Sequence, residues 1–168
     1  LLGLSRTMRT GLSEEEQSLT AQSVSYLREP LLLSFAKAAM PSRVHRPAYP
    51  DFVSVREFDD QGRVVRECRF LGLFTSSVYT QSVRRIPFIR RKVETVVQRA
   101  NFGSSAHLAK ELVQVLEVLP RDELFQAPID ELFENAIAIV QIQERNRLRL
   151  FLRFDPYRRF CYCLVYVP

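Results

Sequence analysis

Histidine and cysteine, which often carry acid–base, nucleophilic or metal-binding chemistry, are scarce in this chain, with two and three residues. Of the two histidines, His45 lies in a proline-rich loop and His107 lies at the start of an expected helix. Neither has a cysteine, serine or carboxylate at a spacing typical of a catalytic pair or a metal ligand set. We therefore expect surface or helix-capping histidines, and the sequence predicts no catalytic residue.

The chain contains three cysteines, Cys68, Cys161 and Cys163. Cys161 and Cys163 lie two residues apart on one expected strand, without the CxxC spacing or the fourth ligand of a structural zinc site. We expect three reduced, unligated cysteines that pack as small buried apolar side chains, and no metal site. Few cysteines, no signal peptide and no long apolar run together predict a cytoplasmic protein without membrane contact.

Acidic pairs and glycines likewise predict structure rather than catalysis. Asp59 and Asp60 lie in an expected turn, and Asp122 and Glu123 lie at a helix start, where carboxylates accept hydrogen bonds from free backbone N–H groups. A nucleotide site needs a glycine-rich loop, but the five glycines are spread over positions 3, 11, 62, 72 and 103. We therefore expect no cofactor-binding residue and no cofactor within this chain.

Arginine supplies most of the positive charge of the chain, whose formal net charge is +5. The basic side chains form two clusters in sequence, the first with Arg84, Arg85, Arg90, Arg91, Lys92 and Arg99, the second with Arg145, Arg147, Arg149, Arg153, Arg158 and Arg159. Such clusters could bind the phosphates of a nucleic acid, or they could line solvated faces and meet acidic surfaces of a partner. Because no nucleic-acid motif accompanies them, nucleic-acid binding remains a remote alternative.

Two segments are expected. Residues 1–29 are rich in serine and threonine and are weakly patterned, so we expect a loosely ordered segment, with a short helix possible after the capping box Ser13–Glu16. Residues 30–168 are expected to form a single α+β domain. Within it, residues 30–37 read as a strand, and residues 51–58 and 63–74 as a hairpin in which Gly62 supplies the positive φ of the turn.

Three helices and a second hairpin are expected to follow. Pro87 begins the first helix, Ser104 or Ser105 caps the second, and Pro128 begins the third. Residues 147–154 and 160–167 form the hairpin, and its leucines alternate with arginines, which predicts a half-buried strand. We expect Ile137 of the third helix and Leu150 of the hairpin to lie in the core.

This order of elements predicts an α+β fold with one five-stranded antiparallel sheet and the three helices on one face. It is similar to sensor domains of the PAS or GAF type, with an ACT-like module as the alternative. The chain lacks an initial methionine and ends on a strand that is apolar on both faces, so we expect a piece of a larger protein. Residues 160–167 are its expected main association site, with Tyr162, Val165 or Tyr166 against another chain.

Several segments resemble the large bacterial NAD-dependent glutamate dehydrogenases over residues 30–168. They are Val44-His45-Arg46-Pro47, Phe58-Asp59, Gly62-Arg63-Val64-Val65, Arg69-Phe70-Leu71-Gly72-Leu73-Phe74-Thr75-Ser76, Ile86-Pro87, Arg90-Arg91-Lys92-Val93, Pro120-Arg121-Asp122-Glu123-Leu124-Phe125-Gln126, Gln143-Glu144-Arg145, and Arg153-Phe154-Asp155-Pro156 through Cys163-Leu164-Val165-Tyr166-Val167-Pro168. The resemblance implies a place in the N-terminal non-catalytic region, described as ACT-like domains and helical motifs. It implies a parent enzyme that oxidatively deaminates L-glutamate with NAD, and it carries no catalytic residue onto this chain.

Two functions stay open for the chain itself. A sensor domain would need a concave pocket with a few converging polar groups for a small-molecule effector. A structural or assembly module would need an exposed apolar patch that meets other domains or subunits of the parent enzyme. We expect one of these two roles, regulatory or assembly-related.

Overall fold

The structure is a computed structural model that describes residues 5–9, 31–42, 44, 47–103, 105–145, 147–157 and 160–167. The chain divides into two compact units, which we describe separately. The sheet unit comprises Leu1–Thr75 and Phe154–Cys161, and the helical unit comprises Ser76–Arg153 and Tyr162–Pro168. The helix expected after Ser13 lies outside the described residues.

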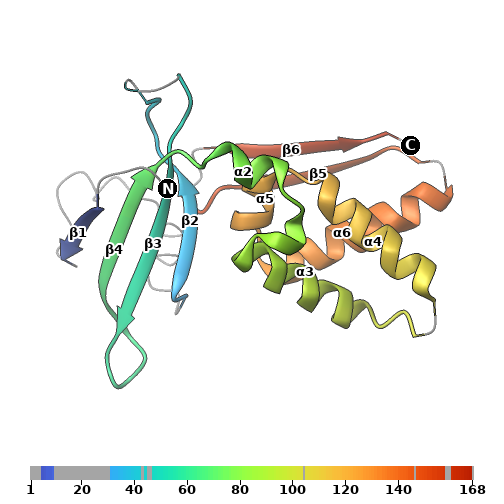
Figure 1. Cartoon of the computed structure of the whole chain (residues 1–168), viewed down its shortest axis with the longest axis horizontal. Helices are drawn as coiled ribbons and strands as arrows, with labels where there is room; N and C mark the ends of the chain where they lie inside the picture. Colours follow the sequence, from blue (N-terminus) through green and yellow to red (C-terminus); the bar gives the residue numbers. More distant parts are fainter. Residues whose placement is uncertain are drawn as a thin grey trace. The chain divides into compact units, whose positions relative to one another are not determined.

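The sheet unit contains β1 (Ser5–Arg9), β2 (Leu33–Lys37), β3 (Asp51–Phe58) and β4 (Val64–Gly72). These strands form one antiparallel sheet in the order β1-β4-β3-β2 (Figure 1). The β3–β4 turn matches its sequence signal, because Gly62 has a φ of 74° and the Asp59 carboxylate accepts hydrogen bonds from the backbone N–H groups of Gln61 and Arg63. These hydrogen bonds lower the pKa of the Asp59 carboxyl, and the bond from the Arg63 N–H has the largest effect.

One face of this sheet is buried. Phe52, Ser54 and Arg56 alternate along β3 on this face, and each is at most 9% exposed. The ring of Tyr157 packs against Phe52 at a centroid distance of 5.8 Å. The short 154–161 segment therefore belongs to this unit through aromatic contact with the sheet.

The helical unit contains α2 (Ser76–Thr80), η2 (Val83–Arg85), α3 (Pro87–Ala100), α4 (Ala106–Val118), α5 (Arg121–Gln126) and α6 (Ile129–Arg145). Strands β5 (Arg149–Phe154) and β6 (Cys161–Tyr166) form a separate two-stranded sheet. Pro87 lies at the start of α3 as expected, and the helix ends at Ala100, followed by the C-cap residue Asn101, whose φ is 42°. Among the described helices, none is long and apolar enough to cross a membrane.

Buried apolar side chains form the core of the helical unit, and they come from η2, α3, α4, α5, α6, the turns between them and β5. They are Val83, Ile86, Ile89, Val93, Val96, Leu112, Val115, Leu116, Leu119, Leu124, Phe125, Ala127, Leu132, Ala136, Ala138, Ile139, Val140, Ile142 and Phe151. Ile137 is only half-buried, because α6 presents Leu132, Ala136, Ile139 and Val140 to the core. These four residues, spaced 4, 3 and 1 apart, lie along one side of the helix. The buried side of α6 is therefore rotated away from Ile137, which we expected in the core.

The prediction of one five-stranded sheet is wrong, and with it the PAS/GAF-like and ACT-like architectures. The α+β class holds, but β5 and β6 pair only with each other among the described strands (Figure 1). Turn residues specify which neighbouring strands form a hairpin, whereas the joining of two hairpins depends on contacts far apart in sequence. In this chain β5 does not join the larger sheet, because Phe151 and Arg153 of β5 contact the helices of the helical unit.

Candidate interaction surface

The outward side of the β5–β6 hairpin is apolar and exposed. On the β5 side, Leu148, Leu150 and Leu152 are 68%, 50% and 56% exposed. On the β6 side, Val165 and Val167 are 53% and 65% exposed, and Cys163 is also exposed. We call these six residues the outer apolar face, which contains no charged side chain.

The hairpin turn explains why these residues share one side. The Asp155 N–H donates to the Phe160 carbonyl at 2.9 Å, and the Asp155 carboxylate accepts from the N–H groups of Tyr157 and Phe160. With Asp155 opposite Phe160, equal steps along both strands place Leu152 opposite Cys163 and Leu150 opposite Val165. Opposed residues of an antiparallel pair point to the same side of the sheet.

The inward side of β5 is anchored by a buried ion pair. Arg153 Nε lies 2.8 and 2.9 Å from the two carboxylate oxygens of Glu123 on α5, and Arg153 Nη2 lies 2.5 Å from Oε2. The two side chains are only 10% and 4% exposed. Phe151, two residues earlier, is 6% exposed and joins the core. Because alternate residues point to opposite sides, Leu150 and Leu152 must then face outward.

The prediction that Leu150 lies in the core is therefore wrong. The pattern of leucine alternating with arginine suggested buried leucines and solvated arginines. A guanidinium can occupy the inward side when a buried carboxylate pairs with it, and Glu123 provides that partner 30 residues earlier in the chain.

A buried lysine fixes the end of α5. Lys92 Nζ on α3 donates to the carbonyl oxygens of Leu124, Phe125 and Ala127 at 2.9, 2.8 and 2.7 Å. Burial, followed by the nearby charge of Arg153, lowers the pKa of Lys92 to about 8, and Glu123 opposes this shift. Lys92, Glu123 and Arg153 thus tie α3, α5 and β5 together. Sequence reasoning missed this cluster, although Lys92 lies within the apolar stripe of α3, between Ile89 and Val96.

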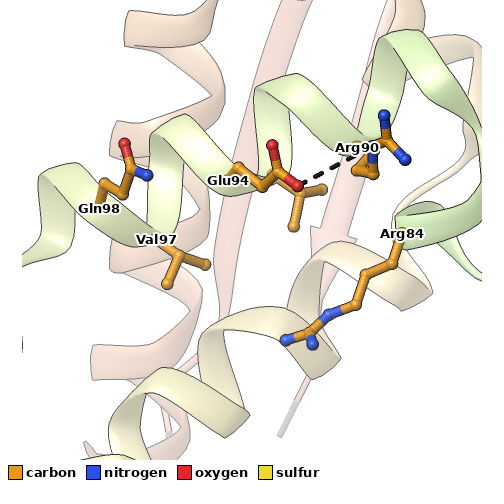
Figure 2. A pocket seen from close by; sticks show the side chains of 6 residues that line it. Arg84, Arg90, Glu94, Val97 and Gln98 are labelled. Atoms are coloured by element: carbon orange, nitrogen blue, oxygen red, sulfur yellow. Dashed lines mark ion pairs between the residues drawn. The ribbon is translucent and has the colours of Figure 1, made fainter.

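A groove of about 270 Å³ runs along α3 (Figure 2). Its lining residues are Arg84, Arg90, Val93, Glu94, Val97 and Gln98. Arg90 and Glu94 form an ion pair at 3.9 Å, and Figure 2 shows the Arg84 side chain reaching toward the same side of α3 as Val97. Its charged lining groups are thus the Arg84 guanidinium and the Arg90–Glu94 ion pair, beside the apolar Val93 and Val97.

The residues singled out for chemistry do not come together. His107 is exposed on α4, with Nδ1 3.2 Å from Glu111 one helical turn later, and His45 lies outside the described residues. Within the part of the chain that the structure describes, no group of three or more His, Cys, Asp and Glu residues could hold a metal ion. Cys161 and Cys163 are exposed and Cys68 is half-buried, so the expectation of buried cysteines is wrong.

Some residues of the basic clusters are engaged by other groups of the protein. Arg84, Arg85, Arg90 and Arg91 are exposed on η2 and the N-terminal part of α3. Lys92 and Arg153, by contrast, are internal and bound to protein groups, and Arg99 pairs with Asp130. The charge available for an external phosphate is therefore smaller than the sequence indicates.

Comparisons with known proteins agree with the resemblance seen in the sequence. A family model described as "Glutamate dehydrogenase, helical motif 1" matches residues 86–145, which cover α3 to α6. The chain is 68% identical over 167 residues to a protein of Pseudomonas aeruginosa named "NAD-specific glutamate dehydrogenase", covering 99% of this chain and 10% of that protein. Proteins with the same name from Halomonas elongata and Mycobacterium tuberculosis are 51% and 38% identical over 85% and 82% of this chain, and over 9% and 8% of their own lengths. The chain thus spans about a tenth of these relatives.

Proposed function

Because this chain belongs to the family of large NAD-specific glutamate dehydrogenases, we propose that it is a non-catalytic module of the N-terminal region and serves assembly of the parent enzyme. The parent enzyme converts L-glutamate to 2-oxoglutarate and ammonia in the cytoplasm. Its NAD and its catalytic residues lie outside these 168 residues. Other domains or subunits of the parent are the partners of the module.

The outer apolar face carries the assembly role. An exposed, contiguous apolar patch on a folded unit is typical of a surface that another protein surface covers. Burial of a leucine or valine side chain contributes about 1.5–3 kcal/mol, so covering six half-exposed side chains contributes on the order of 5 kcal/mol before ordering costs. That contribution is large enough to hold a domain in place.

The shape of the face supports the same role. The Arg153–Glu123 pair and Phe151 fix the inward side of β5 to the helical unit, so the outward side is presented on a rigid support. Rigid presentation reduces the entropy lost when a partner docks. A surface of this kind is suited to a permanent contact.

The test uses the complete dehydrogenase with Leu150→Glu and Leu152→Glu combined. We expect altered oligomeric state or loss of a compact particle by size-exclusion chromatography with light scattering, and reduced activity per subunit. Val118→Glu is the matched control, since Val118 is a single apolar residue, 79% exposed, at the end of α4. Unchanged assembly and activity in the double variant would refute the assembly role.

A second candidate function, effector sensing, is favoured by the groove along α3. Its small size and the guanidinium of Arg84 suit a carboxylate metabolite. Titration calorimetry of the chain with L-glutamate, 2-oxoglutarate and other small carboxylates tests this role, with Arg84→Ala as the variant that should weaken binding. Nucleic-acid binding remains the least supported alternative, because Lys92 and Arg153 are internal.

A further inference from the structure

We infer, on the basis of the proposed assembly role, that the outer apolar face is covered in cis, by another part of the same polypeptide beyond these 168 residues. A second copy of the chain is the competing occupant. The size of the outer apolar face, its chemistry and the length of the relatives favour cover by the same polypeptide over cover by a second copy.

The size of the face suits a tethered partner. Five side chains that are 50–68% exposed, together with the exposed Cys163, make a patch on the order of 500 Å². A stable contact between separate chains buries about 800 Å² on each partner, which is roughly one and a half times that area. A tethered partner needs less area, because the linking chain supplies an effective concentration in the millimolar range.

The chemistry of the face points the same way. The leucine and valine side chains of the outer apolar face form no hydrogen bonds, and the Cys163 side chain offers only a weak thiol donor. A specific contact between separate chains carries about ten hydrogen bonds and uses charge to select and orient its partner. A segment of the same polypeptide is already selected by its covalent connection, so an aliphatic surface without charge is sufficient.

Polypeptide for such a cover is present in this family. The relatives are about ten times as long as the stretch that matches this chain. The occupant is therefore an apolar face of a helix or sheet from that remaining length. Its residues that meet Leu150, Leu152 and Val165 are aliphatic or aromatic, because burial of a charge against this face would leave the charge unpaired.

The test is photo-cross-linking in the complete dehydrogenase, with a benzophenone amino acid in place of Leu152. After irradiation, denaturing electrophoresis separates the two occupants. A cross-link within one chain leaves the mass of a single chain, whereas a cross-link between chains doubles it. Peptide mass spectrometry then locates the attached segment. The same amino acid at position 118 is the control for nonspecific contact.

We expect products with the mass of one chain, in which position 152 is attached to a segment outside residues 1–168. Covalent dimers joined through position 152, or attachment within residues 1–168, overturn cover in cis. If the Glu variants at 150 and 152 still disrupt assembly in that case, the assembly role stands and only the identity of the occupant is wrong. Absence of any product above the position-118 control overturns both.

Discussion

Arg153 on β5 and Glu123 on α5 form a buried, bidentate ion pair, with Arg153 Nε within 2.9 Å of both carboxylate oxygens. The pair decides which side of β5 meets the helices. Residues on that side, Phe151 and Arg153, are inward, and the leucines between and beside them are outward. A short strand is thus oriented by a buried ion pair together with one buried aromatic ring, while its leucines stay outside.

Removal of one partner of this pair should destabilise the chain strongly. Arg153→Ala leaves Glu123 buried without its guanidinium, and we expect a loss of about 3–5 kcal/mol in the free energy of unfolding, measured with urea. The double variant Arg153→Met with Glu123→Leu should recover most of the loss, because no unpaired charge remains. Equal stability of Arg153→Ala and the unmodified chain would show that the pair does not orient β5.

Lys92→Met should also be destabilising, since it removes three hydrogen bonds to the carbonyls that end α5. Three buried carbonyl oxygens would lose their donor, and we expect a loss of about 2–4 kcal/mol in urea unfolding. Lys110→Met is the matched control, because Lys110 is exposed on α4 and should change stability by less than about 0.5 kcal/mol. Similar effects of both substitutions would contradict a role for the carbonyl contacts.

The lowered pKa of Lys92 predicts a pH dependence with a defined sign. The pKa of Lys92 is about 8 in the folded chain, against its ordinary value of 10.5, so between these pH values the unfolded chain binds more protons than the folded chain. The contribution of Lys92 to stability therefore rises as pH increases from 8 to 10.5, by at most about 1.4 kcal/mol per pH unit. Urea unfolding from pH 7 to 10 should show the unmodified chain gaining stability relative to Lys92→Met. A constant difference over that range would show that the pKa is not lowered.

The phase of β5 can be tested with two neighbouring residues. Leu150→Asp should change the stability of the 168-residue chain by less than about 0.5 kcal/mol, because Leu150 faces outward. Phe151→Asp should cost several kcal/mol, because Phe151 is buried and the carboxylate would have no partner. Thermal unfolding followed by circular dichroism measures both. The reverse order of effects would restore the strand phase expected from the leucine pattern.

Short-range signals predicted much of the helical unit and the β3–β4 hairpin. Pro87 begins α3, Gly103 has a φ of 58° after its end, and Pro120 follows α4. Each of these residues acts through its own backbone conformation or its missing N–H. Its effect on the structure can therefore be predicted from the few residues around it. The same applies to Gly62 in the β3–β4 turn. Short runs such as Arg69–Ser76 and Pro120–Gln126 were enough to identify the family.

Only the tertiary structure decided the sheet arrangement, the phase of β5 and the outer apolar face. A strand that alternates leucine and arginine can present either side to the core, because a buried carboxylate that pairs with a guanidinium offsets much of the cost of taking its charge out of water. In this chain that carboxylate, Glu123, lies 30 residues away on a six-residue helix, which in turn is held by Lys92. Contacts over such separations leave no periodic trace in the sequence, so the buried ion pair, and with it the exposed leucines, became visible only once the chain was folded.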